Sequence, residues 1–195
     1  MKSIEEICLE YNIKNYTINN GLVDVNGNVD LSYKRLTKLP LNFGNVSGDF
    51  DCSNNELTNL EGYPNSVGGD FDCSYNELTT LSGSPNSVGG GFDCGHNQLT
   101  DLKGSPNSVG GHFYCSNNEL TTLSGSPNSV GGSFYCLSNP IGSISNKMDI
   151  DFIRAFNIFK VIKDNKVNLK RLKYVMSLFN KPIDIEKIKQ YYEID

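Results

Sequence analysis

Carboxylates recur at a fixed spacing in this chain and are its first candidates for binding chemistry. They occupy two positions of a 21-residue repeat, two residues apart, so on a β-strand their side chains point to the same side. The first position reads Asn28, Asp49, Asp70, Gly91, His112 and Ser133, and the second reads Asp30, Asp51, Asp72, Asp93, Tyr114 and Tyr135. Stacked strands would turn these positions into a patch of carboxylates that gives way to aromatic rings.

A row of like charges needs an explanation. Carboxylates on adjacent strands about 5 Å apart repel each other by about 1–3 kcal/mol per pair before screening, and like charges opposite each other destabilise a sheet. We therefore expect the patch to bind a basic protein partner, with the tyrosines as aromatic anchors. The expected partner-binding residues are Asp30, Asp49, Asp51, Asp70, Asp72, Asp93, His112, Tyr114 and Tyr135. The alternative is a duplicated repeat whose aspartates are simply solvated.

Five cysteines form a second column, at Cys52, Cys73, Cys94, Cys115 and Cys136. A metal site or a redox relay is one interpretation, and filling of the core is the other, since cysteine is small and usually buried. Leu31 stands at the equivalent position of the first repeat, which favours the core. Free thiols stacked in this way also indicate a reducing compartment.

Calcium binding and catalysis find little support in the sequence. The segments 49–53 and 70–74 read Asp-x-Asp-x-Ser like the start of an EF-hand loop, but they lack its later glycine and glutamate. His96 and His112 fall at different positions of successive repeats, and the glycine pairs belong to the repeat rather than to a phosphate-binding motif. We expect no enzymatic activity, no cofactor and no bound metal.

The columns are positioned by a repeat that begins every 21 residues, at Val25, Val46, Val67, Val88, Val109 and Val130. This period, with Phe-x-Cys-x-x-Asn-x-Leu inside it, resembles the leucine-rich repeat. In the copy that starts at Val67, Phe71, Cys73, Leu78 and Leu81 form the set expected to face the core, which stacked copies bury together. The resemblance implies a repeat/solenoid fold, a right-handed coil with a parallel sheet of short strands. Gly68-Gly69 and the segment Gly83–Asn86 are expected to carry the chain through tight bends that need positive or fixed φ. The motif's asparagines, such as Asn76, would satisfy backbone groups at the bends.

The bounds of the repeat divide the chain into three parts. Residues 1–24 are expected to be an N-terminal cap, with a helix over 3–12 that starts in a Ser3–Glu6 capping box and a hairpin that turns at Asn20-Gly21. Residues 25–144 form the solenoid of six coils, the last one truncated. Residues 145–195 have helical apolar spacing and predict a C-terminal α-helical cap of about three helices, beginning near Asp151, after Asn168 and after Asp184.

Charge separates the solenoid from the tail. Residues 1–146 hold 6 Lys+Arg against 15 Asp+Glu, a net charge of −9, whereas residues 147–195 hold 11 against 7, a net charge of +4. The basic side chains form either a solvated face of the cap or a second binding surface, made of Lys163, Lys166, Lys170, Arg171 and Lys173. Nucleic acid is not expected on the acidic solenoid; the basic tail is where it, or an acidic partner, could bind.

Segments 23–52 and the following Pro-x-x-Val-Gly-Gly repeats resemble the small leucine-rich repeat proteins of phages and other mobile genomes. The resemblance implies a non-catalytic protein-binding module, such as a phage inhibitor of a host or defence protein. The rival functions are a small-molecule or nucleotide-binding sponge, and an assembly protein that docks through the basic helices. The chain has no stretch of about 18 apolar residues and no signal-peptide core near Met1, so we expect a cytoplasmic protein without a membrane anchor.

Overall fold

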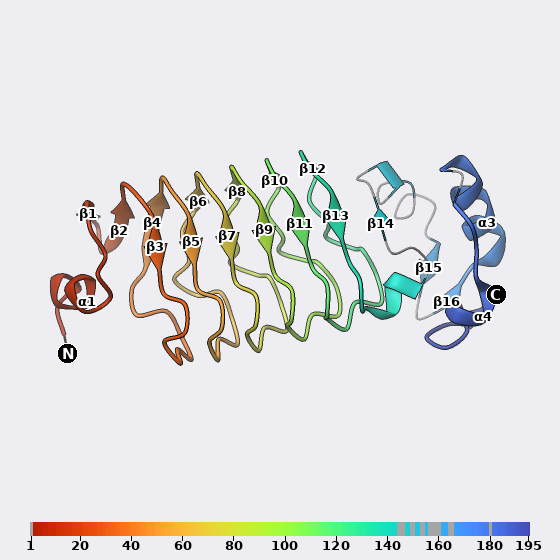
Figure 1. Cartoon of the computed structure of the whole chain (residues 1–195), viewed down its shortest axis with the longest axis horizontal. Coiled ribbons are helices and arrows are strands. Elements are labelled where there is room, and N and C mark those ends of the chain that lie inside the picture. The colour runs from red at the N-terminus through yellow and green to blue at the C-terminus, as the bar shows by residue number, and fades with distance from the viewer. Residues whose placement is uncertain are drawn as a thin grey trace.

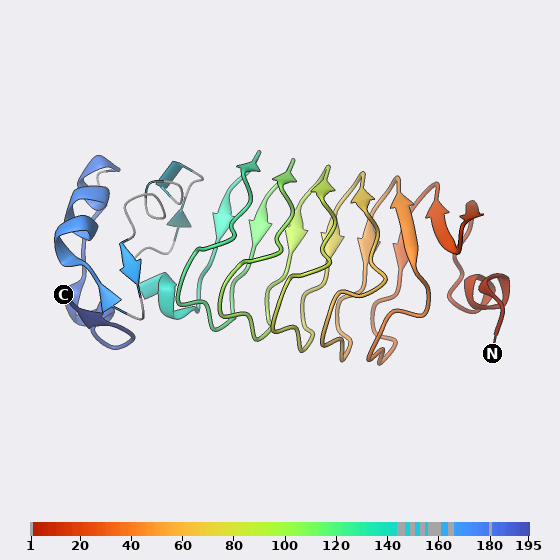
Figure 2. The same ribbon diagram turned by 180° about the vertical axis from the view of Figure 1, so that it is seen from behind.

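The computed structural model describes residues 2–143, 147–148, 151–152, 155, 161–163, 166–179 and 181–195. Its centre is a solenoid in which successive coils stack along the long axis of the molecule, as Figure 1 and the reverse view in Figure 2 show. The 21-residue repeat and the solenoid fold predicted from the sequence are thus confirmed.

Each full coil contributes one short strand to each of two parallel sheets. The serine sheet has the order β1 (Tyr16–Asn19), β2 (Leu22–Val25), β4 (Phe43–Val46), β6 (Ser66–Val67), β8 (Ser87–Val88), β10 (Ser108–Val109) and β12 (Ser129–Val130). The aspartate sheet has the order β14 (Lys147–Met148), β13 (Phe134–Tyr135), β11 (Phe113–Tyr114), β9 (Phe92–Asp93), β7 (Phe71–Asp72), β5 (Phe50–Asp51) and β3 (Val29–Asp30). The predicted parallel sheet of short strands is present, and a second sheet accompanies it because the Ser-Val dipeptides also pair from coil to coil.

The core is the column of side chains predicted to face inward. The phenylalanines of the aspartate sheet are buried and stack face to face, with ring centroids 5.6 Å apart between Phe50 and Phe71 and 4.9 Å apart between Phe113 and Phe134. All six cysteines are buried and none is in a disulfide bond, and the Cys73 thiol donates to the carbonyl of Asp93 at 3.3 Å. Burial raises the pKa of the Cys73 thiol, which disfavours the reactive thiolate. The cysteine column therefore fills the core.

A column of buried asparagines closes the bend after each strand of the aspartate sheet. Asn97 is representative, since its Oδ1 accepts from the Leu78 N–H at 2.9 Å. Its Nδ2 donates to the carbonyls of Cys73 at 3.1 Å, Cys94 at 3.2 Å and Gly95 at 3.2 Å. This confirms the predicted role of the repeat asparagines and ties each coil to the one before it.

Two kinds of glycine shape the coil. Gly83 has φ +94°, as the predicted turn requires. Gly68 and Gly69, which the sequence predicts as a bend of the same kind, do not adopt positive φ. A Cβ on Gly68 would instead collide with the carbonyl oxygen of Ser47, one coil earlier, so the side chain is excluded by the close approach of two backbones.

The N-terminal end carries the expected helix and hairpin. Helix α1 (Ile4–Glu10) begins in a complete capping box between Ser3 and Glu6. Strand β1 pairs antiparallel with β2 and covers the edge of the serine sheet. At the other end of the solenoid, the 3₁₀ helix η1 (Pro140–Ser143) follows β13, and β14 pairs antiparallel with β13. Capping of this kind protects strand edges that would otherwise be open to other chains.

In its described residues, the C-terminal region is less helical than predicted. Helix α3 (Leu169–Leu178) and the short helix α4 (Ile185–Ile188) begin at their expected N-caps, Asn168 and Asp184. Residues 162–163 continue no helix but form β15 (Ile162–Lys163), which joins β16 (Lys166–Val167) and β17 (Glu193–Ile194) in a small sheet. The third helix ends early because the chain turns back to pair with β16.

The remaining expectations for this region fall mostly on residues outside the described set. Of the first predicted helix, positions 151, 152 and 155 are helical, and most of the others are not described; nor is Ile144, the predicted end of the repeats. The buried Tyr192 links the region to the solenoid, since its hydroxyl donates to the carbonyl of Thr121 at 3.0 Å. Every helix in the described part of the chain is too short or too polar to cross a membrane.

Candidate functional site

The second carboxylate column forms as the sequence predicts. Strand register places Asp51 beside Asp30 on one side and Asp72 on the other. Asp93 lies between Asp72 and Tyr114, and Tyr135 follows Tyr114. Neighbouring parallel strands are about 4.8 Å apart, so this column is a continuous row on the outer face of the aspartate sheet.

Local hydrogen bonds hold the carboxylates of this column in place. Each accepts, through Oδ1, the backbone N–H two residues further along the chain, at distances of 2.8–3.0 Å. The pairs are Asp30 with Ser32, Asp51 with Ser53, Asp72 with Ser74 and Asp93 with Gly95. Aspartate favours this turn, in which its own side chain replaces a backbone acceptor.

The first column links successive coils. Asp49 Oδ1 accepts from the N–H of Asp70 at 2.8 Å, and Asp70 Oδ1 accepts from the N–H of Gly91 at 2.6 Å. The Nδ1 atom of His112 takes the same role toward Ser133 at 2.8 Å. These bonds correct the argument that such a ladder serves no structural purpose, because they offset part of the repulsion between the aspartates.

The columns nevertheless carry uncompensated charge. Within the described part of the chain, none of the ion pairs involves an aspartate of these columns. Burial raises the pKa of Asp72, and the charges of Asp51 and Asp70 raise it further against the Ser74 hydrogen bonds. Burial raises the pKa of Asp93 to about 6, with Asp72 adding to the shift. A cation that bound here would relieve this cost.

The acidic end of the face is hollowed. A depression of about 330 Å³ lies over strands β3, β5 and β7, and its lining is Asn28, Val29, Asp30, Asp49, Phe50, Asp51, Asp70 and Asp72. Five of these eight residues are aspartates, so the hollow offers carboxylate oxygens to a positively charged side chain.

The aromatic end of the face is a compact cluster. The rings of Tyr114 and Tyr135 are stacked, with centroids 5.0 Å apart and planes 6° apart. The His112 ring lies 5.8 Å from each of them. The pKa of Tyr114 is raised by burial, then by Tyr135 and by the charges of Asp93 and Asp70. The structure therefore brings the predicted aromatic and acidic residues together on one face.

A second aromatic pair borders this face and was missed by sequence reasoning. Tyr75 and His96 stack with ring centroids 3.9 Å apart, and His96 Nε2 lies 3.0 Å from Asn117 Nδ2. Tyr75, His96 and Asn117 all have φ between +53° and +58° and occupy the same position of successive repeats. The sequence signal for this pair was available, because the residue type at this position changes from repeat to repeat while the neighbouring core positions stay the same.

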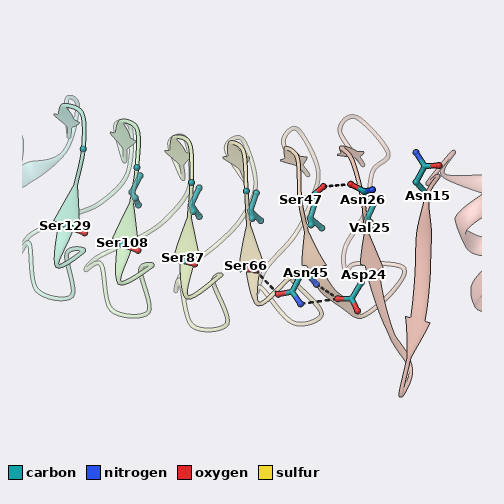
Figure 3. Close-up of a pocket in the computed structure, with 18 of the residues that line it drawn as sticks. Asn15, Asp24, Val25, Asn26, Asn45, Ser47, Ser66, Ser87, Ser108 and Ser129 are labelled. Atoms are coloured by element: carbon teal, nitrogen blue, oxygen red, sulfur yellow. Dashed lines mark hydrogen bonds between the residues drawn. The ribbon is translucent and has the colours of Figure 1, made fainter.

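The serine sheet presents a different surface, which sequence reasoning interpreted only as bends. A groove of about 1000 Å³ runs along it, and Figure 3 shows serines repeating from Ser66 to Ser129. Ser66 Oγ donates to Asn45 Oδ1 at 2.7 Å. Asp24, the only charged residue of the lining, accepts from Asn19 and Asn45. The groove is therefore nearly neutral, and several polar groups at its N-terminal end, Asp24 among them, already have partners.

The predicted second surface is only partly assembled. Lys170, Arg171 and Lys173 are exposed on helix α3. Lys166 lies on β16 and pairs with Glu193 at 3.2 Å. Lys163 belongs to β15, and its side chain is outside the described set.

No protein-family model matches the chain, and neither the curated proteins nor the solved structures contain a significant match. Among the residues that the structure describes, no group of three histidine, cysteine or acidic side chains is arranged to hold a metal ion. The candidate site is therefore the outer face of the aspartate sheet.

Proposed function

We propose that this protein is a non-catalytic binding module that holds a basic segment of a partner protein on the outer face of its aspartate sheet. One observation carries the proposal. Asp51, Asp72 and Asp93 are fixed by backbone hydrogen bonds and partly buried, while none of the described ion pairs neutralises them. Fixed, desolvated carboxylates favour a cationic partner more strongly than mobile surface ones do.

The two ends of the face have complementary roles in this proposal. The hollow over β3, β5 and β7 attracts lysine or arginine side chains, and its charge speeds encounter with a basic partner. The stacked Tyr114 and Tyr135 supply apolar contact area at low entropic cost, as aromatic residues do in the centres of interfaces. The resemblance to small phage repeat proteins extends the proposal: the partner is a host protein whose action the bound module blocks.

The test is binding of a defined basic peptide. A fluorescein-labelled peptide of three Gly-Ser-Arg units is titrated with the protein, and anisotropy is measured at low and at moderate salt. We expect salt-sensitive binding to the wild type. Asp51→Asn, Asp72→Asn and Asp93→Asn together should weaken it by about tenfold or more, since asparagine keeps the turn acceptor but removes the charge.

The matched control removes the same total charge from the coil of Asp51, the coil of Asp72 and the coil that follows that of Asp93. Glu56→Gln, Glu77→Gln and Glu119→Gln change three exposed carboxylates that lie outside the two columns. Equal weakening by both triple variants would indicate only a general response to net charge and would contradict the proposal. An affinity pull-down with the wild type and the asparagine variant then identifies the natural partner.

A further inference from the structure

One coil departs from the repeat where the acidic and aromatic parts of the face meet. Its outer strand reads Gly91-Phe-Asp93-Cys-Gly95, so a single carboxylate is flanked by two residues without side chains. The equivalents of Gly95 are serines in the adjacent coils, Ser74 and Ser116. The result is a notch around Asp93, between the acidic coil on one side and the aromatic coil on the other.

Neither glycine is demanded by the fold. Both have φ outside the positive region. A Cβ on Gly91 would meet its nearest neighbour, the carbonyl oxygen of His112, at 3.3 Å, and one on Gly95 would meet Asp93 Oδ1 at 3.0 Å, a contact that the other coils accommodate with serine. Packing thus permits either glycine or serine at positions 91 and 95, whereas it permits only glycine at position 68 and its equivalents.

The notch exposes one face of an aromatic ring. Tyr114 stacks on Tyr135, which belongs to the next coil, so the opposite face of Tyr114 is directed toward the coil of Asp93. The stack of rings ends there, because Asp93 takes the next place in the column. A Cβ on Gly91 would lie 3.5 Å from Asp70 Oδ1 and a Cβ on Gly95 would lie 3.0 Å from Asp93 Oδ1, so these two carboxylates border the space beside the two glycines.

The carboxylates keep acceptor capacity in this space. Asp93 Oδ1 accepts from Gly95 N–H, and Asp70 Oδ1 accepts from Gly91 N–H. Among the described residues, no hydrogen bond reaches the Oδ2 atom of either carboxylate, so both can accept from a ligand. A planar cation would continue the stack of rings and donate from its edge to carboxylate oxygens.

We infer that the notch seats one arginine side chain of the basic partner, its guanidinium stacked on Tyr114 and donating to Asp93. Arginine fits better than lysine because only the guanidinium is planar and has several donors in one plane. This inference rests on the proposed function and identifies the residue that anchors the partner. The bound guanidinium takes the place that another ring would occupy in a longer stack.

The test compares two peptides of equal charge on two proteins. One fluorescein-labelled peptide has three Gly-Ser-Arg units and the other three Gly-Ser-Lys units. We expect the wild type to bind the arginine peptide about fivefold more tightly than the lysine peptide. The variant Gly91→Ser with Gly95→Ser fills the notch with residues that other coils carry there, at Ser133 and Ser74. This variant should bind both peptides with the affinity that the wild type has for the lysine peptide.

The outcomes separate this inference from the proposed function. Salt-sensitive binding of both peptides with equal affinity, or an arginine preference that survives in the serine variant, would overturn the notch and leave the acidic face as the binding surface. Failure of both peptides to bind would remove the proposed function and the notch together. Thermal unfolding of the serine variant at the wild-type temperature shows that a lost preference does not come from a lost fold.

Discussion

The two sheets are built by the same coils but use their outer faces differently. On the serine sheet, the Ser-Val dipeptide is identical in the four coils from β6 to β12. On the aspartate sheet, the outer side chains change from carboxylates at β5 and β7 to rings at β11 and β13. The first surface is repetitive and nearly neutral, whereas the second is charged and differs from coil to coil.

The difference shows where the copies have diverged. The copies beginning at Val67, Val88 and Val109 differ at seven of their 21 positions, and the inward residues are the same in all three. Four of the seven lie within six consecutive positions, from the residue before the aspartate-sheet strand to the third residue after it: 70/91/112, 72/93/114, 74/95/116 and 75/96/117. Packing does not dictate these residues, and their concentration on one surface favours binding there over chance variation.

The sharpest way to test the contrast is a matched pair of glycine substitutions in one coil. A Cβ on Gly89, in the serine sheet's bend, would collide with the carbonyl oxygen of Gly68. Gly89→Ala should therefore lower the free energy of unfolding by about 2–3 kcal/mol. Gly91→Ala, on the aspartate-sheet side, should change it by about 0.5 kcal/mol or less, because its nearest neighbours lie at 3.3 and 3.5 Å. Urea unfolding measures both, and equal losses would show that the two bends are equally constrained.

The repeat, the core and the position of the columns could be predicted because each depends on residues that recur at a fixed period. The serine sheet could not be predicted in the same way. Strands such as Ser66–Val67 are two residues long, too short for an alternating pattern, and the following glycines resemble an ordinary turn. The steric reason for Gly68 appears only when the backbone of Ser47, one coil away, is in place.

The C-terminal sheet and the support of the site were missed for a related reason. Ile162 and Val167 fit a helical or a strand pattern equally well, and pairing with Ile194 depends on how the distant chain end folds back. The hydrogen bond from Gly91 N–H to Asp70 joins residues 21 apart in the sequence. Residue types indicated what could bind, but not that the same carboxylates hold the coils together.

A second, smaller effect concerns the charge of the aspartate sheet. Asp93 has a pKa of about 6, above the value of about 3.9 typical of an unfolded chain. The folded protein therefore binds more protons here, so stability falls as the pH rises from about 4 through about 6, and the loss is complete above pH 7. Asp93→Asn should raise the free energy of unfolding by about 1–2 kcal/mol at pH 7.5 and leave it unchanged near pH 4.

Asp30 in the same column provides the control of opposite sign. Hydrogen bonds from Ser32 lower the pKa of Asp30, so its ionised form stabilises the fold at neutral pH and this stabilisation is lost as the pH falls through the lowered pKa. Asp30→Asn should therefore slightly destabilise the protein at pH 7.5, where Asp93→Asn stabilises it. Urea unfolding of both variants at the two pH values measures the difference. The same sign for both at pH 7.5 would contradict the described environments.

The smallest expected effect lies in the middle of the serine sheet. Ser108 is partly exposed in the groove, away from the Asn45 and Asp24 contacts at its end. Ser108→Ala removes one hydroxyl from a surface position and should change the free energy of unfolding by about 0.5 kcal/mol or less. Binding of the Gly-Ser-Arg peptide should also be unchanged, because the groove offers that peptide almost no charge. A clear loss of peptide affinity in this variant would indicate that the peptide binds in the groove and not on the aspartate sheet, because the Ser108 side chain belongs only to the groove.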